Sequence, residues 1–340
     1  MNPVAVVDVG GTRLRSATWT PRGGLRDRTE AASPGRYRDP DATPEQLRAR
    51  LVQEICQAVP ARPDAVAGVS VGAALDHRTG AVYASAPLWG DCTEPLDLLG
   101  ELRAARPDVR WHVVNDVTAA LLHAAASPVL AAVRKVLLAT ISTGIACRVI
   151  DQRDGRIAVD DCGLQGEIGH LPAHAAMRGE PLRLRCDCGA PSHLAAFSSG
   201  PGIRRVAELL RLNRPRQWQE SLLGKRIADG AAFEDAFAAA LHSADAAATE
   251  LLSVVTEPVA DVVRTALCLD PELDRIVLTG GVAVGLDEHY RTAVLEHLDR
   301  AGTYLTGELA PDWARRRIEI AGPESADCLV GAGIAAAGQR

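Results

Sequence analysis

The chain has 340 residues, 47% hydrophobic and 24% charged, which is typical of a globular protein. This length is enough for two packed domains. The net charge of −6 gives no electrostatic reason to expect nucleic acid, and no basic run marks a membrane-surface patch. We therefore expect a small-molecule partner, with no nucleic acid and no membrane.

The cellular location is predicted from what the chain lacks. No apolar segment approaches the roughly 20 residues of a membrane span, and a strand-like run beginning at Val4 leaves no room for a signal peptide. The predicted location is therefore cytoplasmic. Most of the eight cysteines stand singly, which favours reduced thiols over a disulfide framework. Only Cys186 and Cys188 are close enough to suggest a shared site.

The first predicted element is a hairpin with functional groups at its tip. The apolar run Val4–Val9 meets Gly10 and Gly11, after which the strand pattern resumes. Glycines there let backbone N–H groups approach phosphate oxygens, and Thr12 adds a hydroxyl donor. Asp8, at the strand end, could hold a hydrated cation. The alternative is an ordinary hairpin with a Gly-Gly turn.

The next elements complete a first α/β domain. Residues 23–43 are predicted to form an outer strand and loop, residues 44–59 a helix, and residues 66–71 a buried strand. Small residues over 71–76 would let a ligand lie close to the backbone. A simple strand-to-turn connection explains that stretch equally well.

A candidate catalytic pair follows the next strand. The strand predicted over 109–114 delivers Asn115 and Asp116 to its carboxyl end, where ligands bind in open α/β sheets. Asp116 is a candidate base that accepts the proton of an attacking hydroxyl, while Asn115 binds the same substrate. The alternative is that Asp116 only caps the following helix.

Residues 135–150 repeat the pattern of the first hairpin, with Thr143 and Gly144 in the turn. Two such hairpins, separated by about 130 residues, suggest an internal duplication. Two similar α/β domains would then face each other across a cleft and hold phosphate groups from both sides.

A candidate metal site lies further along the chain, at His170, Cys186, Cys188 and His193. Sulfur and imidazole are zinc ligands, and four at this spacing could close a tetrahedral site that fastens a loop with little core. However, Cys-x-Cys is a weak signal, and His193 could be a surface residue.

The remaining segments are predicted to be mostly core. Helices are expected over 203–212 and from 233 to 269, the second interrupted at Pro258, and their apolar stripes are typical of packed helices. The chain then ends with a strand over 316–320 and a helix over 326–337.

A third strand-to-glycine turn occurs where the strand predicted over 275–279 meets Gly280 and Gly281. Bare backbone leaves a flat slot that could receive a base and ribose. A plain strand-to-helix connection is the alternative.

In this order, these blocks resemble the ROK family of sugar kinases and repressors, within the actin-like ATPase fold. The resemblance covers nearly the whole chain. Its most specific parts are residues 166–170 and the Cys186/Cys188 block, which are similar to the family's sugar and zinc signature. Four further blocks coincide with the first phosphate, catalytic, second phosphate and adenosine motifs: 8–12, 115–116, 142–145 and 278–282.

The resemblance implies two actin-like, ribonuclease H-like α/β domains flanking an ATP and substrate cleft. The implied boundaries are 1–117 plus 323–340 for a small domain with a returning C-terminal helix, and 118–322 for a large domain carrying the zinc loop. The implied cofactors are ATP, Mg²⁺ and structural Zn²⁺, and the implied assembly is a homodimer.

The resemblance also implies roles for single residues. Asp116 would be the base for transfer of the γ-phosphoryl group to an exocyclic primary hydroxyl, with Asn115, Glu167 and His170 contacting the substrate. The implied zinc ligands are His170, Cys186, Cys188 and His193. The implied ATP and phosphate contacts are Asp8, Gly10, Gly11, Thr12, Thr143, Gly144, Gly280 and Gly281.

Departures from the family pattern fall on the substrate side. Ala195 replaces a glutamate, residues 86–88 read Ala-Pro-Leu where the family has Pro-Asn-Leu, and residues 72–74 read Gly-Ala-Ala where it has Pro-Gly-Pro. His193 replaces a cysteine, which keeps zinc chemistry reasonable. A site without these polar partners loses affinity for the hydroxyls they bound, which argues against glucose or an N-acetylhexosamine.

The leading hypothesis is an ATP-dependent kinase of a sugar or sugar-like polyol. Two substrate classes stay open: an ordinary hexose or hexosamine, and an aminosugar or C7 cyclitol, which the altered pocket favours. A repressor is disfavoured because we expect no helix-turn-helix ahead of Asp8. A non-catalytic sugar-binding regulator is disfavoured because the phosphate and base residues are intact.

Overall fold

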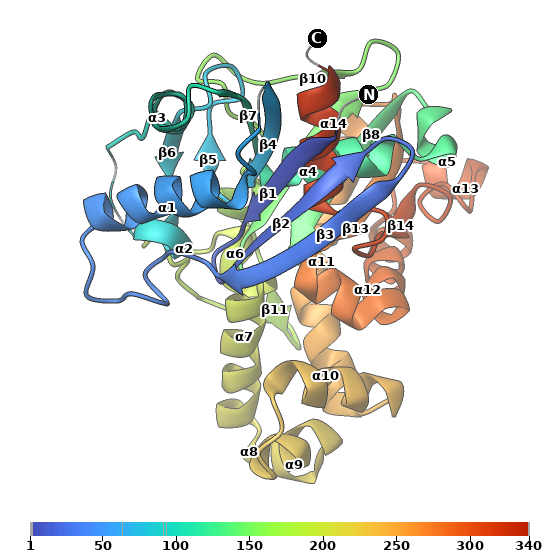
Figure 1. Ribbon diagram of the computed structural model, residues 1–340. Coiled ribbons are helices and arrows are strands. Elements are labelled where there is room, and N and C mark those ends of the chain that lie inside the picture. The colour runs from blue at the N-terminus through green and yellow to red at the C-terminus, as the bar shows by residue number, and fades with distance from the viewer. Residues whose placement is uncertain (1–2, 63, 91, 93, 339–340) are drawn as a thin grey trace.

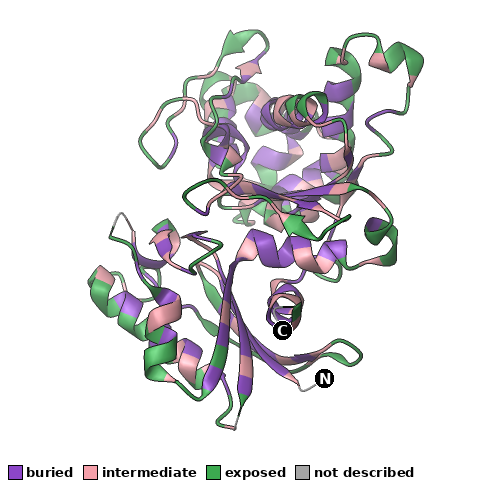
Figure 2. Cartoon of the chain, turned by 90° about the horizontal axis from the view of Figure 1, so that it is seen from above, coloured by how far each residue is buried: buried purple, intermediate pink, exposed green. Residues whose placement is uncertain are grey.

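The computed structural model describes residues 3–62, 64–90, 92 and 94–338. Figure 1 shows a mixed α/β chain with two sheet-containing domains. Figure 2 shows buried residues gathered inside each part, and they form separate hydrophobic cores on the two sheets. None of the helices in the described part of the chain has the length and apolar character needed to cross a membrane.

The first sheet has the strand order β3-β2-β1-β4-β7. Its first three strands form an antiparallel meander, and the last two run parallel to β1. The predicted outer strand is therefore β3, at the edge. The strands are β1 Val4–Val9, β2 Arg13–Thr20, β3 Gly24–Ala32, β4 Ala65–Val71 and β7 Val109–Asn115.

The second sheet repeats this plan with the order β10-β9-β8-β13-β14. Again a meander of three antiparallel strands is followed by two strands parallel to its innermost strand. The shared topology fits the internal duplication expected from the two hairpins. The strands are β8 Lys135–Ile141, β9 Ile145–Asp151, β10 Arg156–Ile157, β13 Leu273–Thr279 and β14 Ile318–Ile320.

Helices cover both sheets. On the first sheet the predicted helix over 44–59 is confirmed as α1 Pro44–Ala58, which begins with a capping box from Thr43 and Gln46. The smaller elements of this part are β5 Ala74–Leu75, β6 Val82–Ala84, α2 Ala86–Trp89 and α3 Leu98–Ala105. Two helices, α4 Asp116–Ala125 and α5 Pro128–Ala131, lead to the second sheet.

The C-terminal helix, α14 Cys328–Gly338, returns to the first sheet. Its Leu329, Ala332 and Ala336 share a buried cluster with Val4 and Trp19 of the β1–β2 hairpin. This packing agrees with the expected return of the last helix, whereas the exact domain boundaries remain a prediction.

The second domain carries most of the helices. Its longer helices are α7 Gly200–Asn213, α10 Phe233–His242, α11 Ala246–Leu269 and α12 Gly280–Ala301, the last of which is kinked at Asp287. Its short elements are η1 Ile168–His170, β11 Ala176–Met177, β12 Glu180–Pro181, α6 Leu194–Ser198, α8 Pro215–Glu220, α9 Leu222–Ala228 and α13 Thr306–Leu309.

The expected helix interruption at Pro258 is wrong. Pro258 lies buried inside α11, and the break falls earlier, at Ala244, whose φ is +52°, and Asp245, which caps α11. A proline inside a helix removes one backbone hydrogen bond. Here residues on both sides of Pro258, among them Val255 and Val259, are packed in the core, which holds the helix together.

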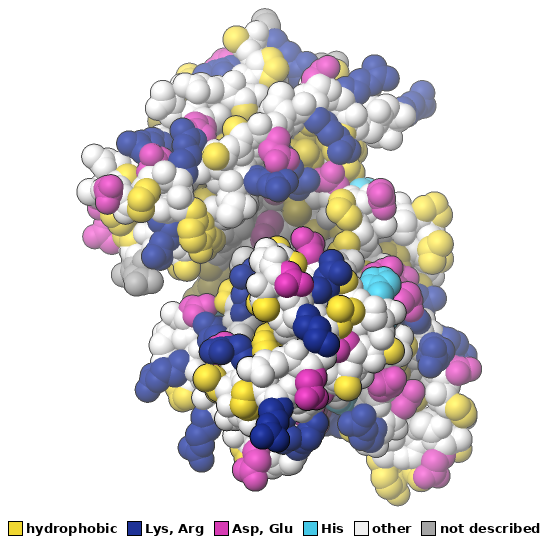
Figure 3. Space-filling model, turned by 90° about the horizontal axis from the view of Figure 1, so that it is seen from below, with side chains coloured by type: hydrophobic (Ala, Val, Ile, Leu, Met, Phe, Trp, Pro, Cys, Tyr) yellow, Lys and Arg dark blue, Asp and Glu magenta, His cyan; other side chains and the backbone are white. Residues whose placement is uncertain are grey.

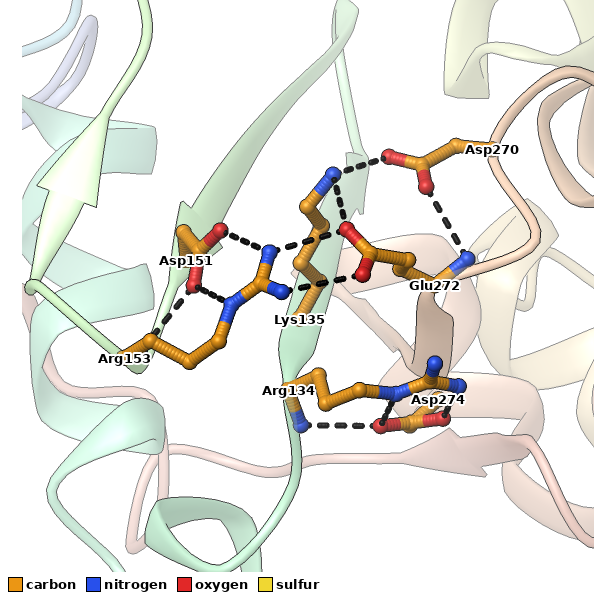
Figure 4. A network of polar contacts seen from close by, with 7 residues as sticks. All are labelled: Arg134, Lys135, Asp151, Arg153, Asp270, Glu272 and Asp274. Carbon is orange, nitrogen blue, oxygen red and sulfur yellow. Dashed lines mark hydrogen bonds and ion pairs between the residues drawn. The ribbon is translucent and has the colours of Figure 1, made fainter.

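A network of charged side chains joins the strands at one edge of the second sheet (Figure 4). Arg153 bridges Asp151 and Glu272, Lys135 bridges Asp270 and Glu272, and Arg134 binds Asp274. Lys135 is the first residue of β8, so the network lies at the opposite end of this strand from its glycine turn. The network secures three strands, although each exposed pair adds little by itself.

Candidate active site

The parallel strands of the first sheet bring the predicted catalytic residues together at their carboxyl ends. Strands β1, β4 and β7 end side by side, and Gly72 N–H donates to the Val9 carbonyl across 2.9 Å. A Cβ at Gly72 would lie 3.3 Å from Oδ2 of Asp116. The small residue at position 72 therefore leaves room for the Asp116 carboxylate beside the end of β1.

Asp8 is buried at this edge and has partners that sequence reasoning missed. Arg15 faces it across the hairpin and donates to Oδ2 from Nη2 at 2.7 Å and Nε at 3.1 Å. Ser70 Oγ donates to Oδ1 at 2.8 Å. Arg15 Nη2 also lies 3.5 Å from Asp327. The position of Arg15 directly opposite Asp8 in a tight hairpin was the available signal.

Asn115 is the residue that caps helix α4. Its Oδ1 accepts from the N–H groups of Val117 and Thr118, at 2.9 and 3.2 Å, and its Nδ2 donates to Ala73 O at 2.8 Å. The alternative reading of Asp116 as the cap is therefore wrong, because the preceding residue takes that position. The predicted contact of Asn115 with substrate remains a prediction.

Asp116 opens helix α4 and is partly buried. Burial, and then the nearby negative charge of Asp8, raise the pKa of Asp116 to about 7. The Val117 N–H, 2.9 Å from Oδ1, and the positive charge of Arg148 lower this pKa. The negative charge of Glu167 raises it further. A carboxyl group with a pKa near the working pH is suited to general-base chemistry.

The first hairpin tip is an exposed turn with one tightly packed glycine. Gly10 N–H donates to Arg13 O at 2.9 Å, and Thr12 is exposed. A Cβ at Gly11 would come within 2.7 Å of Pro87 Cβ. The 86–88 stretch, one of the substrate-side departures, therefore packs directly on this tip.

The second hairpin tip lies beside the starts of two long helices. Thr143 and Gly144 are exposed, and Ser142 O accepts from Gly200 N–H of α7 at 2.8 Å. Gly280, the first residue of α12, has φ of +90°, and a Cβ there would be 2.6 Å from Ile141 O. Helix N-termini favour anions, and the N-terminus of α7 lies beside this tip.

The four predicted zinc ligands come together. One ligand atom from each of His170, Cys186, Cys188 and His193 lies within 4.8 Å of all the others. Cys188 Sγ is 3.3 Å from His193 Nδ1, and the rings of His170 and His193 meet edge to face. Two sulfurs and two imidazoles fit tetrahedral zinc, so the donor set and its spacing suit that ion.

Glu167 precedes η1 and lies next to a buried arginine, Arg148 of β9, that sequence reasoning missed. Arg148 Nη1 donates to Cys147 O at 2.8 Å and to Gln165 O, and its Nη2 is 3.5 Å from Glu167 Oε1. The available signal was a charged residue inside an apolar strand.

The two domains also touch through their loops. His77 N–H donates to Gly163 O, and Arg78 Nη2 donates to Asp161 O, both at 2.7 Å. Burial, followed by the charge of Arg148, lowers the pKa of His77. Figure 3 shows a hollow between two parts of the surface, with acidic side chains at its margin.

Comparisons with known proteins agree with this architecture. The ROK family model matches residues 4–332. The 2-epi-5-epi-valiolone 7-kinase of Actinoplanes sp. is 57% identical over 98% of this chain and 93% of its own length. A C(7)-cyclitol 7-kinase of Streptomyces hygroscopicus subsp. jinggangensis is 29% identical with the same coverage.

Among solved structures, a ROK family glucokinase from Streptomyces griseus, in complex with glucose and AMPPNP, superimposes with a TM-score of 0.72. It is 19% identical, with 97% of this chain and 98% of that chain covered, so it bears on the fold alone. The predicted fold class of two α/β domains is confirmed. The chain belongs to the ROK family.

Proposed function

We propose that this protein is an ATP-dependent kinase that phosphorylates the exocyclic primary hydroxyl of a C7 cyclitol, with 2-epi-5-epi-valiolone as the first candidate. The observation that carries the chemistry is Asp116, a partly buried carboxyl with a raised pKa at the edge where strands β1, β4 and β7 end. The substrate class is supported by the 57% identity to a kinase of that name and the 29% identity to a C(7)-cyclitol kinase.

In the proposed reaction Asp116 accepts the proton of the substrate hydroxyl as its oxygen attacks the γ-phosphorus of ATP. ADP then leaves, and the phosphoryl group remains on the substrate oxygen. Because ionised Asp116 is needed, its pKa of about 7 keeps much of it ready to act near neutral pH. Positioning and charge stabilisation supply most of the remaining rate increase in phosphoryl transfer.

The residues of the two hairpins suit ATP and Mg²⁺. We assign phosphate contacts to the backbone and hydroxyl donors of 10–12 and 143–144, and the adenosine side to Gly280 and Gly281. Asp8 would hold Mg²⁺, which neutralises phosphate charge. Asp8 already binds Arg15 and Ser70, but Arg15 has a second carboxylate neighbour, Asp327, and can keep it when a cation takes Asp8.

The substrate side is remodelled where the family resemblance expects sugar contacts. Ala195 and Pro87 have no polar side-chain atoms, and Pro87 packs on Gly11 of the phosphate hairpin. Glu167 and Asn115 are then the remaining polar contacts proposed for the ring. A ring with a different hydroxyl pattern from glucose suits such a site.

The zinc site is proposed as a structural one, with His170, Cys186, Cys188 and His193 as ligands. The clustering of their donor atoms supports the metal role of His170, and its contact with substrate stays a prediction. A homodimer, a cytoplasmic location and the domain boundaries 1–117 plus 323–340 and 118–322 complete the proposal. These three points are supported by the family resemblance.

The deciding experiment measures ADP release by the purified protein with Mg-ATP and a panel of ring substrates. The panel holds 2-epi-5-epi-valiolone, other C7 cyclitols, an aminosugar, glucose and N-acetylmannosamine. Preferred turnover of a C7 cyclitol, with the phosphate placed on its exocyclic hydroxyl by NMR, supports the proposal. Preference for glucose would show an ordinary hexose kinase, and binding without turnover would show a sugar-binding regulator.

A further inference from the structure

We propose that Arg148 is a positioning residue that fixes Glu167 in the substrate cleft, so that this carboxylate binds hydroxyl groups of the ring. The inference rests on the proposed kinase function and adds a residue that the motif comparison did not assign. It follows from how the segment 165–167 is attached to strand β9.

That segment is fastened to β9 by a series of hydrogen bonds. Cys147 N–H donates to Gly166 O at 2.7 Å, and Val149 N–H donates to Gln165 Oε1 at 3.1 Å. Gly166 has φ of +66°, and a Cβ there would lie 1.9 Å from Cys147 O. The backbone next to Glu167 therefore lies directly against the strand that carries Arg148.

Arg148 completes this attachment from its side chain. Its Nη1 donates to the carbonyls of Cys147 and Gln165, while Nη2 faces the Glu167 carboxylate at 3.5 Å. One planar guanidinium thus contacts the strand, the segment and the acid together. A lysine, with one compact ammonium group, cannot match this fork geometry.

The exposures of the two partners differ in a way that suggests their roles. The Arg148 side chain is 3% exposed, whereas that of Glu167 is 41% exposed. A buried cation is costly without a partner, so Arg148 needs the negative charge of Glu167 nearby. Glu167 keeps a free side, and an oriented carboxylate there can accept hydrogen bonds from ring hydroxyls.

The charges around the cleft support the same role. Asp8, Asp116 and Glu167 are all acidic; beyond burial, Asp8 and Glu167 raise the pKa of Asp116, whereas Arg148 lowers it. Without Arg148, repulsion among the carboxylates would push the most exposed of them, Glu167, outward. Arg148 is thus expected to affect ring binding more than ATP binding.

The test is a double-mutant cycle with Arg148→Met, Glu167→Gln and the double variant, using the ring substrate that the wild-type enzyme phosphorylates best. We expect each single variant to raise the KM for the ring about 10-fold, and to leave the KM for ATP within about 2-fold. The KM of the double variant for the ring should not exceed the higher of the two single-variant values, because both substitutions remove one shared function. Arg148→Lys should recover part of the loss.

Arg178→Met is the control, since Arg178 makes a closer ion pair, with Glu250 at 2.7 Å, outside the proposed site. It should leave both KM values unchanged. If Arg148→Met does not fold, by circular dichroism, the cycle is run with Arg148→Lys in its place. An unchanged ring KM, an equal rise in both KM values, or multiplicative effects in the double variant would each overturn the role of Arg148.

Failure of this inference is distinguishable from failure of the proposed function. The substrate panel with wild-type enzyme decides the kinase activity and its substrate. If glucose proves to be that substrate, the C7-cyclitol assignment fails, and the same cycle with glucose still decides the role of Arg148. If the protein binds a ring without turnover, calorimetric dissociation constants replace KM and the same pattern is required.

Discussion

The two hairpins share one topology but differ in the chemistry at matching positions. Counting back from the turns, the pair Asp8 and Arg15 of the first hairpin corresponds to Thr140 and Ala146 of the second. The first hairpin thus holds an ion pair beneath its tip, and the second only neutral groups. The two hairpins therefore share a backbone plan, whereas at this matched position the charges occur in the first hairpin alone.

A second matched position shows the reverse, with the charged residue in the second hairpin. Ala17 on β2, opposite Val6, corresponds to Arg148 on β9, opposite Leu138. Ala17 is small and packs beneath the returning helix α14, whereas Arg148 reaches the segment that carries Glu167. The same strand position therefore serves packing in one domain and the candidate substrate site in the other.

The largest expected effect comes from removing the proposed base, Asp116, which follows strand β7 of the first sheet. Asp116→Asn should lower kcat by about 100-fold to 10,000-fold, because the amide cannot accept the hydroxyl proton. ATP binding, measured by calorimetry, should stay near normal. Asp97→Asn, at the cap of α3, is the control and should keep full kcat. Retained activity in Asp116→Asn would remove Asp116 from the base role.

The same variant has an expected effect on stability. The pKa of Asp116 is raised in the folded state, to about 7, so wild-type stability falls as pH rises from about 4 to 7. Asp116→Asn removes that cost. At pH 8 it should exceed the wild type in free energy of unfolding by at least about 1 kcal/mol, with no difference near pH 4. Denaturant titrations at the two pH values measure this, and equal stability at pH 8 would contradict it.

The proposed zinc site, which has no counterpart in the first hairpin domain among the described residues, is the next test. Metal analysis should find about one zinc per chain. Cys186→Ser should lose the metal and lower the melting temperature, since metal binding contributes to folding. Cys268→Ser, at an exposed cysteine of α11, should do neither. A metal-free protein that is folded and active would show that packing alone holds the loop.

The hairpin tips should respond differently to substitution. Asp8→Asn should raise the Mg²⁺ concentration for half-maximal rate by about 10-fold or more, because it removes the charge proposed to hold the cation. Thr143→Ala should raise the KM for ATP by less than about 10-fold, through loss of one hydrogen bond. A similar Mg²⁺ dependence in the two variants would contradict the division between the hairpins.

The smallest expected effect is a shift in pH dependence. For the wild type, kcat/KM should rise with pH through about 7 as Asp116 loses its proton. In Asp8→Asn this limb should move to lower pH, because loss of the neighbouring negative charge favours ionised Asp116. Rates measured from pH 5 to 9 at saturating Mg²⁺ decide this, and an unmoved limb would show that Asp8 does not act on Asp116.

Local patterns predicted much of the fold and of the candidate site. Both hairpins, helix α1 and the strand that delivers Asp116 follow from apolar periodicity and turn residues, which act over short stretches of chain. The grouping of the candidate zinc ligands was also predicted from spacing and residue type, because a short turn places Cys186 and Cys188 together. Pro258 was misjudged because its local preference is overridden by the packing of α11 in the core.

By itself, then, the sequence determined which segments become strands, turns and helices, and which residue types stand at their ends. Only the tertiary structure decided the state of those residues. Burial and the charges of Asp8 and Glu167, which come from separate segments, raise the pKa of Asp116. The pairing of Arg148 with Glu167 likewise depends on a loop returning to a strand, because electrostatic energy depends on distance in space and not on separation along the chain.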